Sequence, residues 1–170
     1  TIDIDSFWNV GSEREHKGHR IHAYPAKFPA FITQKAIQYA KNSRIDINCV
    51  ADIFCGCGTV AFEAKRLGID FWGCDLNPTA VLIAKAKSSN YRESMIEGYY
   101  QAILSSFDNE YSSYAMPENV NERIRYWFNP QEIRDLSLLK TCILDTVPRG
   151  SKYRYYFLCA FSNILKSTSR

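Results

Sequence analysis

Residues 49–59 read CVADIFCGCGT, and this stretch predicts how the chain folds. Its first half is a short apolar run that contains Asp52, which is typical of a buried parallel strand. Gly56 and Gly58 then form a turn, and residues 59–67 follow as a helix. Glycines let the backbone bend sharply and approach a ligand closely. The order of strand, glycine turn and helix therefore predicts a ligand at the carboxyl end of the strand.

A second strand follows the helix at residues 70–74, DFWGC, and ends at Asp75. Asn77 and Pro78 then suit the cap and first position of another helix, whose apolar stripe includes residues 80–84. This alternation predicts an α/β unit with a parallel sheet. An acid that ends the second strand can accept the hydroxyls of a ribose, so the pattern predicts a nucleoside cofactor site.

The identity of the cofactor depends on Asp52. A carboxylate at the turn suits a ligand with an ammonium group, such as the methionine end of S-adenosylmethionine, and is ill suited to a pyrophosphate. The dinucleotide pattern Gly-x-Gly-x-x-Gly has Ala61 at its third glycine position, which that pattern tolerates. We therefore favour S-adenosylmethionine and keep a dinucleotide-dependent oxidoreductase as an alternative.

Three segments resemble the amino-group DNA methyltransferases. DIFCGCGT at residues 52–59 resembles their cofactor loop, and GCDLNP at residues 73–78 resembles their second-strand motif. HAYPAKFP at residues 22–29 is similar to a segment of certain bacterial modification methylases. The resemblance covers roughly residues 16–90, about half of the chain.

The resemblance implies a Rossmann-like S-adenosylmethionine-dependent methyltransferase fold with a partial parallel sheet and a helical C-terminal extension. It implies a restriction–modification-type enzyme that methylates adenine N6 or cytosine N4 of DNA. Residues 27–29 and the 52–58 turn would surround the methionine part, with Lys27 available to its carboxylate. Residues 75–77 would hold the adenosine, and Phe54 would form a wall of the pocket. The implied cofactor site consists of Tyr24, Pro25, Lys27, Phe28, Pro29, Asp52, Phe54, Cys55, Gly56, Gly58, Thr59, Asp75, Leu76 and Asn77.

The catalytic motif of this class is missing. Amino methyltransferases hold the target amine with a motif of the type Asp/Asn/Ser-Pro-Pro-aromatic, and the sequence contains no Pro-Pro pair. No catalytic residue is therefore assigned. The chain is either a fragment or split subunit, completed by a second chain or downstream segment, or a non-catalytic subunit that binds cofactor and nucleic acid. Because tRNA enzymes carry a similar loop, an RNA N-methyltransferase is a further alternative.

The strand–helix alternation stops near residue 90. This predicts a cofactor-binding part at residues 1–90 and a helical extension at residues 91–170, where a target-recognition region would begin. Residues 120–170 contain 9 Lys and Arg against 4 Asp and Glu, whereas residues 1–119 contain 12 against 14. Such a basic segment is either a phosphate-facing surface, which makes DNA the expected partner, or a solvated face.

Helices are also predicted outside the central motif. One begins at Pro29, with Ile32, Ala36, Tyr39 and Ala40 on its apolar face. Another begins at Asn129-Pro130-Gln131-Glu132, which suits a capped helix start. A last helix, at residues 153–166, is expected to bury Phe157, Ala160, Phe161 and Ile164.

Composition excludes several classes of protein. The six cysteines form no Cys-x-x-Cys pair, and His16, His19 and His22 have no cysteine or carboxylate partner at a clear spacing, so we expect reduced thiols and no metal. No apolar run is long enough to span a membrane, and the first residues carry no secretory pattern. We therefore expect a soluble cytoplasmic protein.

Overall fold

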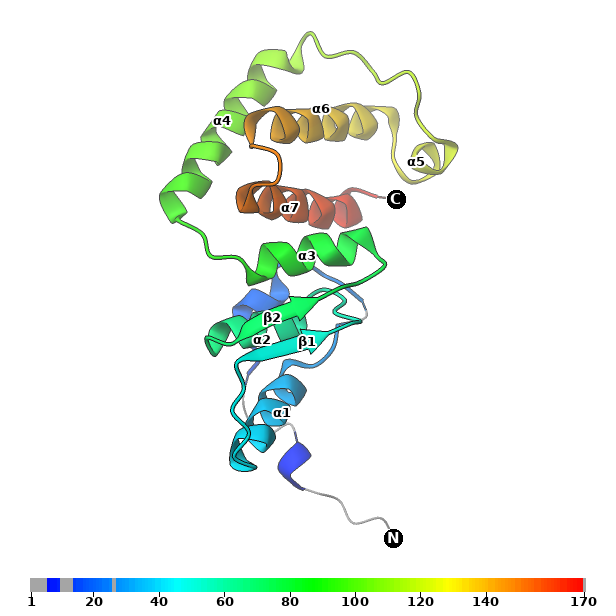
Figure 1. Cartoon of the computed structure of the whole chain (residues 1–170). Helices are drawn as coiled ribbons and strands as arrows, with labels where there is room; N and C mark the ends of the chain where they lie inside the picture. The colour runs from blue at the N-terminus through cyan, green and yellow to red at the C-terminus, as the bar shows by residue number, and fades with distance from the viewer. Residues whose placement is uncertain (1–5, 10–13, 26, 170) are drawn as a thin grey trace. The chain divides into compact units, whose positions relative to one another are not determined.

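The computed structural model describes residues 6–9, 14–25 and 27–169. The chain divides into two compact units, a first unit at residues 1–88 and a second unit at residues 89–170 (Figure 1). Their boundary lies two residues before the one expected from the sequence. Each unit is described by itself below.

The first unit is a strand–helix–strand–helix unit preceded by an N-terminal helix, as the sequence predicts. The two strands are parallel neighbours, with Cys49 paired to Asp70 and Asp52 paired to Gly73. Helix α2 lies against both strands, and α1 and α3 both pack against α2. In chain order the elements are η1 Ser6–Trp8, η2 Lys17–Arg20, α1 Ala30–Asn42, β1 Cys49–Asp52, α2 Thr59–Arg66, β2 Asp70–Gly73 and α3 Pro78–Ser88.

Local sequence signals explain where these helices begin and end. Gly68 follows α2 with φ +67°, the left-handed conformation that terminates helices. The Asn77 side chain accepts a hydrogen bond from the Thr79 N–H at 2.9 Å, so Asn77 caps α3 as predicted. Pro29 caps α1 rather than occupying its first position, a difference of one residue.

Burial in the first unit differs from two of the predictions. Helix α1 buries Ala30, Thr33 and Ile37, so none of the four residues predicted for its apolar face is buried. Ala36 is exposed, and Tyr39 is 59% exposed. The strand residues are exposed or half-buried rather than buried. The apolar cluster of Ile37, Ala64 and Ile69 covers one face of the two-stranded sheet, whereas Trp72 is 57% exposed. A parallel strand is buried on both faces only when helices cover both.

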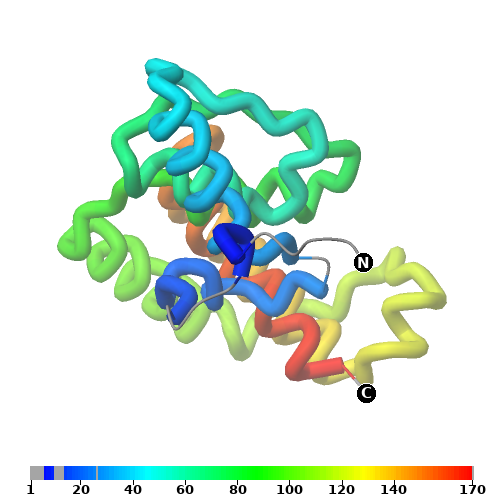
Figure 2. The backbone as a smooth tube through the Cα atoms, turned by 90° about the horizontal axis from the view of Figure 1, so that it is seen from below, coloured from blue at the N-terminus to red at the C-terminus, as the bar shows by residue number. Residues whose placement is uncertain are grey.

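The second unit consists of helices, which Figure 2 traces from green to red. Helix α6 packs against both α4 and α7, and the short helix α5 contacts α6. These helices are α4 Glu93–Tyr111, α5 Glu122–Trp127, α6 Pro130–Thr146 and α7 Lys152–Thr168. Their core is the apolar cluster of Ile103, Leu138, Cys142, Ile143, Val147, Tyr153 and Phe157.

The capped start of α6 is confirmed: Asn129 and Glu132 exchange side-chain and backbone hydrogen bonds in a capping box. The predicted burial of α7 is wrong in part. Phe157 is buried, but Ala160 and Ile164 are exposed and line an open apolar groove between α4, α6 and α7. Helix α5 was not predicted, because six residues are too few to show a helical period.

Candidate functional site

The site is built around the turn that joins β1 to α2. Gly56 and Gly58 have φ values of +48° and +75°, so both adopt the left-handed conformation that favours glycine. A Cβ atom on Gly58 would lie 2.7 Å from Cα of Ala84 in α3. The glycine therefore serves two purposes, because it bends the backbone into α2 and lets α3 approach the turn.

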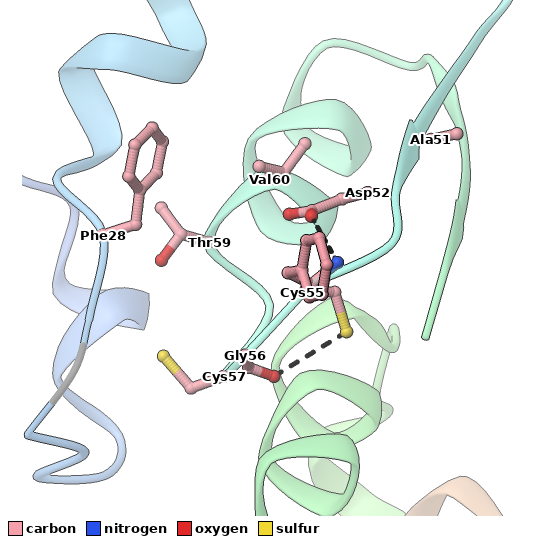
Figure 3. A pocket seen from close by; sticks show the side chains of 9 residues that line it. Phe28, Ala51, Asp52, Cys55, Gly56, Cys57, Thr59 and Val60 are labelled. Carbon is pink, nitrogen blue, oxygen red and sulfur yellow. Dashed lines mark hydrogen bonds between the residues drawn. The ribbon is translucent and has the colours of Figure 1, made fainter. Parts of the chain in front are cut away.

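A cavity of about 340 Å³ opens beside this turn. It lies at the carboxyl end of β1, where open α/β sheets bind ligands. Figure 3 shows Asp52 at the end of the strand, Thr59 at the start of α2 and Phe28 on the N-terminal segment. The lining residues are Phe28, Ala51, Asp52, Phe54, Cys55, Gly56, Cys57, Thr59 and Val60.

Two polar groups in the cavity wall have unused hydrogen-bonding capacity. Oδ1 of Asp52 accepts the Phe54 N–H at 3.0 Å, and Oδ2 has no hydrogen-bond partner among the described residues. The Thr59 hydroxyl is buried and also lacks a partner in that part of the chain. A buried hydroxyl without a partner is costly, and half-buried Asp52 has an acceptor oxygen left over. Both groups therefore fit a polar ligand that supplies partners.

Asp75 reaches the turn from the second strand. Its Oδ2 accepts the Gly56 N–H at 2.8 Å, and its Oδ1 accepts the Asn77 N–H at 2.8 Å. The carboxylate therefore holds the turn in shape, and it does not line the cavity. Leu76 and Asn77 also lie outside the cavity lining, and the Leu76 side chain is fully exposed. The structure thus separates residues 75–77 from the residues that the cavity brings together.

The N-terminal segment approaches the same site. Phe28 lines the cavity, and Asn77 Nδ2 donates to the Tyr24 hydroxyl at 3.4 Å. Lys27, expected to be available to a ligand carboxylate, forms an ion pair with Glu15. Burial by itself would raise the pKa of Glu15, but the hydrogen bond and charge of Lys27 outweigh it and lower that pKa. Pro25 lies in the turn between Tyr24 and Lys27.

Lys87 supports the glycine turn and was not predicted from the sequence. Its side chain is buried, with 4% of the residue exposed, and its Nζ donates to the Cys57 carbonyl at 3.2 Å. Burial lowers the pKa of Lys87. Lys87 follows Ala80, Ile83 and Ala84 at i+7, i+4 and i+3, so its place on the apolar stripe of α3 is the signal that identifies it.

Cys55 at the turn is a protonated thiol rather than a nucleophilic thiolate. Burial raises the pKa of Cys55, and the carboxylates of Asp52 and Asp75 raise it further, so the thiol keeps its proton. All six cysteines are free thiols; Cys49 and Cys74 are exposed and the other four are buried. Within the described ranges, no three His, Cys, Asp or Glu residues are grouped so that they could hold a metal.

A family comparison decides the class of this site. The model of the DNA methylase family matches residues 2–86, half of the chain. The chain belongs to the DNA methylase family. The matched residues include Asp52 and the glycine turn, which line the cavity. They also include Asp75, which holds that turn.

A curated relative of this chain is the Type II methyltransferase M.MvaI of Kocuria varians, which is 26% identical over 159 residues. The alignment covers 89% of this chain and 34% of the relative, so the chain spans about a third of the relative's length. Because 159 residues exceed the first unit, the similarity extends into the second unit. No solved structure matches the chain. None of the helices in the described segments of this chain is long and apolar enough to cross a membrane.

Proposed function

We propose that this chain supplies the S-adenosylmethionine-binding part of a site-specific DNA methyltransferase that acts on an exocyclic amine, adenine N6 or cytosine N4. The observation that carries the proposal is the cavity at the end of β1, where Asp52 and Thr59 present unpaired polar atoms beside the glycine turn. Family membership and the Type II methyltransferase relative support the same reaction class. The Rossmann-like sheet would be completed by strands beyond β1 and β2.

Different residues of the chain would bind different parts of the cofactor. The free oxygen of Asp52 suits the ammonium group of the methionine part, and Thr59 suits its carboxylate end at the start of α2. Asp75 can accept a ribose hydroxyl while it holds the turn, because each carboxylate oxygen has two acceptor sites. Phe54, which is 83% exposed, and the neighbouring Leu76 offer apolar surface to the adenine. When bound, S-adenosylmethionine supplies an activated methyl group on its sulfonium.

The acceptor amine needs a holder that this chain does not contain. An exocyclic amine is a weak nucleophile, so a methyltransferase must position it and accept its hydrogens as charge develops. The open face of the sheet, where Ile53 and Trp72 are exposed, offers room for a further segment. Together with the greater length of the relative, this supports a second chain or downstream segment that carries the Pro-Pro-aromatic motif.

The second unit would contact the DNA. Helix α5 buries none of its residues, and it exposes Tyr126 and Trp127 next to Arg123 and Arg125. The two aromatic rings meet edge to face at 5.1 Å. Exposed aromatic residues interleaved with arginines suit base stacking and phosphate contact. Residues 120–170, with their excess of basic residues, would supply the electrostatic attraction.

Titration calorimetry with S-adenosylhomocysteine tests the cofactor assignment. Asp52→Asn keeps the hydrogen bond from Phe54 but removes the charge, so affinity should fall by roughly 1.5–3 kcal/mol. Asp70→Asn is the matched control, because Asp70 is an exposed carboxylate at the opposite end of the same sheet. Equal affinity in both variants would remove Asp52 from the site. Binding of NAD in place of S-adenosylhomocysteine would favour a dinucleotide enzyme.

A further inference from the structure

A buried carboxylate joins three segments of the first unit. Glu63 in α2 is 1% exposed, and its two oxygens accept four hydrogen bonds. His19 Nε2 lies 2.6 Å from Oε1, and Gln34 Nε2 donates to Oε2 at 2.8 Å. Arg66 Nη1 donates to both oxygens, at 3.0 and 3.2 Å. Since these donors come from η2, α1 and α2, Glu63 connects the N-terminal segment to the helix that follows the glycine turn.

His19 is fitted closely into this junction. Its side chain is fully buried, and its ring centroid lies 4.6 Å from that of Phe62. A Cβ atom on the preceding Gly18 would lie 2.3 Å from Cζ of Phe62, so the backbone of η2 approaches α2 as closely as only glycine allows. Nδ1 of His19 has no partner among the described residues. Because the Glu63 carboxylate can only accept hydrogen bonds, Nε2 is the nitrogen that donates to it.

The contact of His19 also fixes the segment that reaches the cavity. Lys27 and Glu15 form an ion pair that closes a loop around His19. Phe28 follows that loop directly and forms one wall of the cavity. The chain is thus held on both sides of His19, and a release of His19 would free the segment that carries Phe28.

We propose that Glu63 is a positioning residue for the cofactor site: through His19 it docks residues 14–25 on α2 and keeps Phe28 against the cavity. The inference rests on the proposed S-adenosylmethionine site and deepens it. Glu63 touches no cavity residue of the cofactor turn through its carboxylate, and acts through the segment that it holds. Its replacement by glutamine places an amide NH₂ against the donors of Gln34 and Arg66, so at least one of the four hydrogen bonds becomes a repulsion.

Two measurements on the full chain test the proposal, both well below the melting temperature of each variant. The first is trypsin cleavage after Lys17 and Arg20, which are exposed residues of η2. The second is the Kd for S-adenosylhomocysteine by calorimetry. Glu63→Gln and His19→Gln should each be cleaved faster and bind about tenfold more weakly, the effect of one lost charge-assisted hydrogen bond. The double variant should bind S-adenosylhomocysteine as tightly as the single variants do, because the two residues act as a unit.

Ile69→Ala is the control for a purely structural role. Ile69 is buried in the apolar cluster with Ile37 and Ala64. Its side chain is aliphatic and takes no part in the hydrogen bonds of Glu63. This variant should lower the melting temperature and leave both the cleavage rate and the Kd at their wild-type values. If Ile69→Ala weakens binding as much as Glu63→Gln at equal loss of stability, Glu63 is structural and the proposal is overturned.

The outcomes separate this inference from the proposed function. If the wild-type chain fails to bind S-adenosylhomocysteine, the proposed function fails, whatever the trypsin rates show. If the wild type binds and Glu63→Gln binds equally well, the positioning role alone is wrong. If Glu63→Gln is cleaved no faster than wild type, Glu63 does not hold the segment, and the inference is likewise overturned.

Discussion

Buried side chains differ in kind between the two units. Among the residues that the structure describes, the buried polar or charged ones are His19, Thr33, Thr59, Glu63 and Lys87, and all lie in the first unit. The second unit buries aliphatic, aromatic and cysteine side chains instead. Since a buried polar group needs a hydrogen-bonded partner to offset the loss of water, the first unit accepts lower stability for fixed geometry. The difference supports the proposal that the cofactor binds to the first unit, because the core of the second unit offers apolar packing alone.

The largest expected effect contrasts two glycines in the same backbone conformation. Gly58 and Gly150 have φ of +75° and +76°, but only Gly58 has a neighbour in the way of a Cβ. Gly58→Ala should destabilise the first unit by up to about 5 kcal/mol, combining backbone strain with a clash against α3, and abolish S-adenosylhomocysteine binding. Gly150→Ala should cost about 1 kcal/mol. Thermal unfolding of both variants measures this, and equal losses would contradict the role assigned to the Gly58 contact.

A core substitution in the second unit tests whether that unit can be destabilised without loss of cofactor binding. Leu138 is fully buried in the α4–α6–α7 core. Leu138→Ala should lower the free energy of unfolding of this unit by about 3–4 kcal/mol, because it removes buried methyl groups and leaves a cavity. We expect the Kd for S-adenosylhomocysteine to stay unchanged below the melting temperature. A parallel loss of affinity would show that the two units do not divide the work as their cores suggest.

Acid should weaken the first unit through Glu63. Burial by itself would raise the pKa of Glu63, but the hydrogen bonds from His19 and Gln34 and the charge of Arg66 lower it from 4.5 to about 2. Because the folded-state pKa is the lower one, the stabilisation is complete above pH 4.5 and is lost as the pH falls from there toward 2. The loss should be on the order of 3 kcal/mol. Urea unfolding of wild type and Glu63→Gln at several pH values checks it, since the gap between them should close in acid.

The smallest effect concerns nucleic acid. If α5 contacts phosphates, Arg123→Gln should reduce the slope of log K against log salt for duplex DNA by about one. Lys41→Gln is the control, because Lys41 is an exposed cation of the first unit. Fluorescence anisotropy with labelled DNA over a salt series gives both slopes. Equal slopes in the two variants would assign the basic residues of α5 to a solvated surface.

Local signals in the sequence were sufficient to predict the glycine turn, the end of α2 and the starts of α3 and α6. Each of these features depends on one or two neighbouring residues, so it can be predicted without knowledge of the fold. They are the left-handed conformations at Gly56 and Gly58, the Asn77 cap and the Asn129 capping box. The separation of Asp75 from the cavity could not be predicted from the sequence. Its carboxylate binds the Gly56 N–H across 19 positions of the chain, a contact that appears only once β1 and β2 are paired.

Burial was harder to predict than secondary structure. Tyr39 and Ile164 belong to apolar stripes, yet both are exposed, because a stripe shows which face can be buried and not what covers it. The His19–Glu63 pair was missed for a related reason. A glutamate in a helix is usually solvated, and nothing near Glu63 in the sequence indicates that a histidine 44 positions away will reach it.

The open face of the sheet also gives this protein an intrinsic optical probe. The chain has three tryptophans. Trp72 is exposed on β2, and Trp8 and Trp127 are exposed elsewhere. Indole fluorescence shifts to shorter wavelengths when the ring leaves water. In a variant that retains only Trp72, the emission maximum would therefore shift to shorter wavelength when another polypeptide covers that face. This shift would report assembly without an added label.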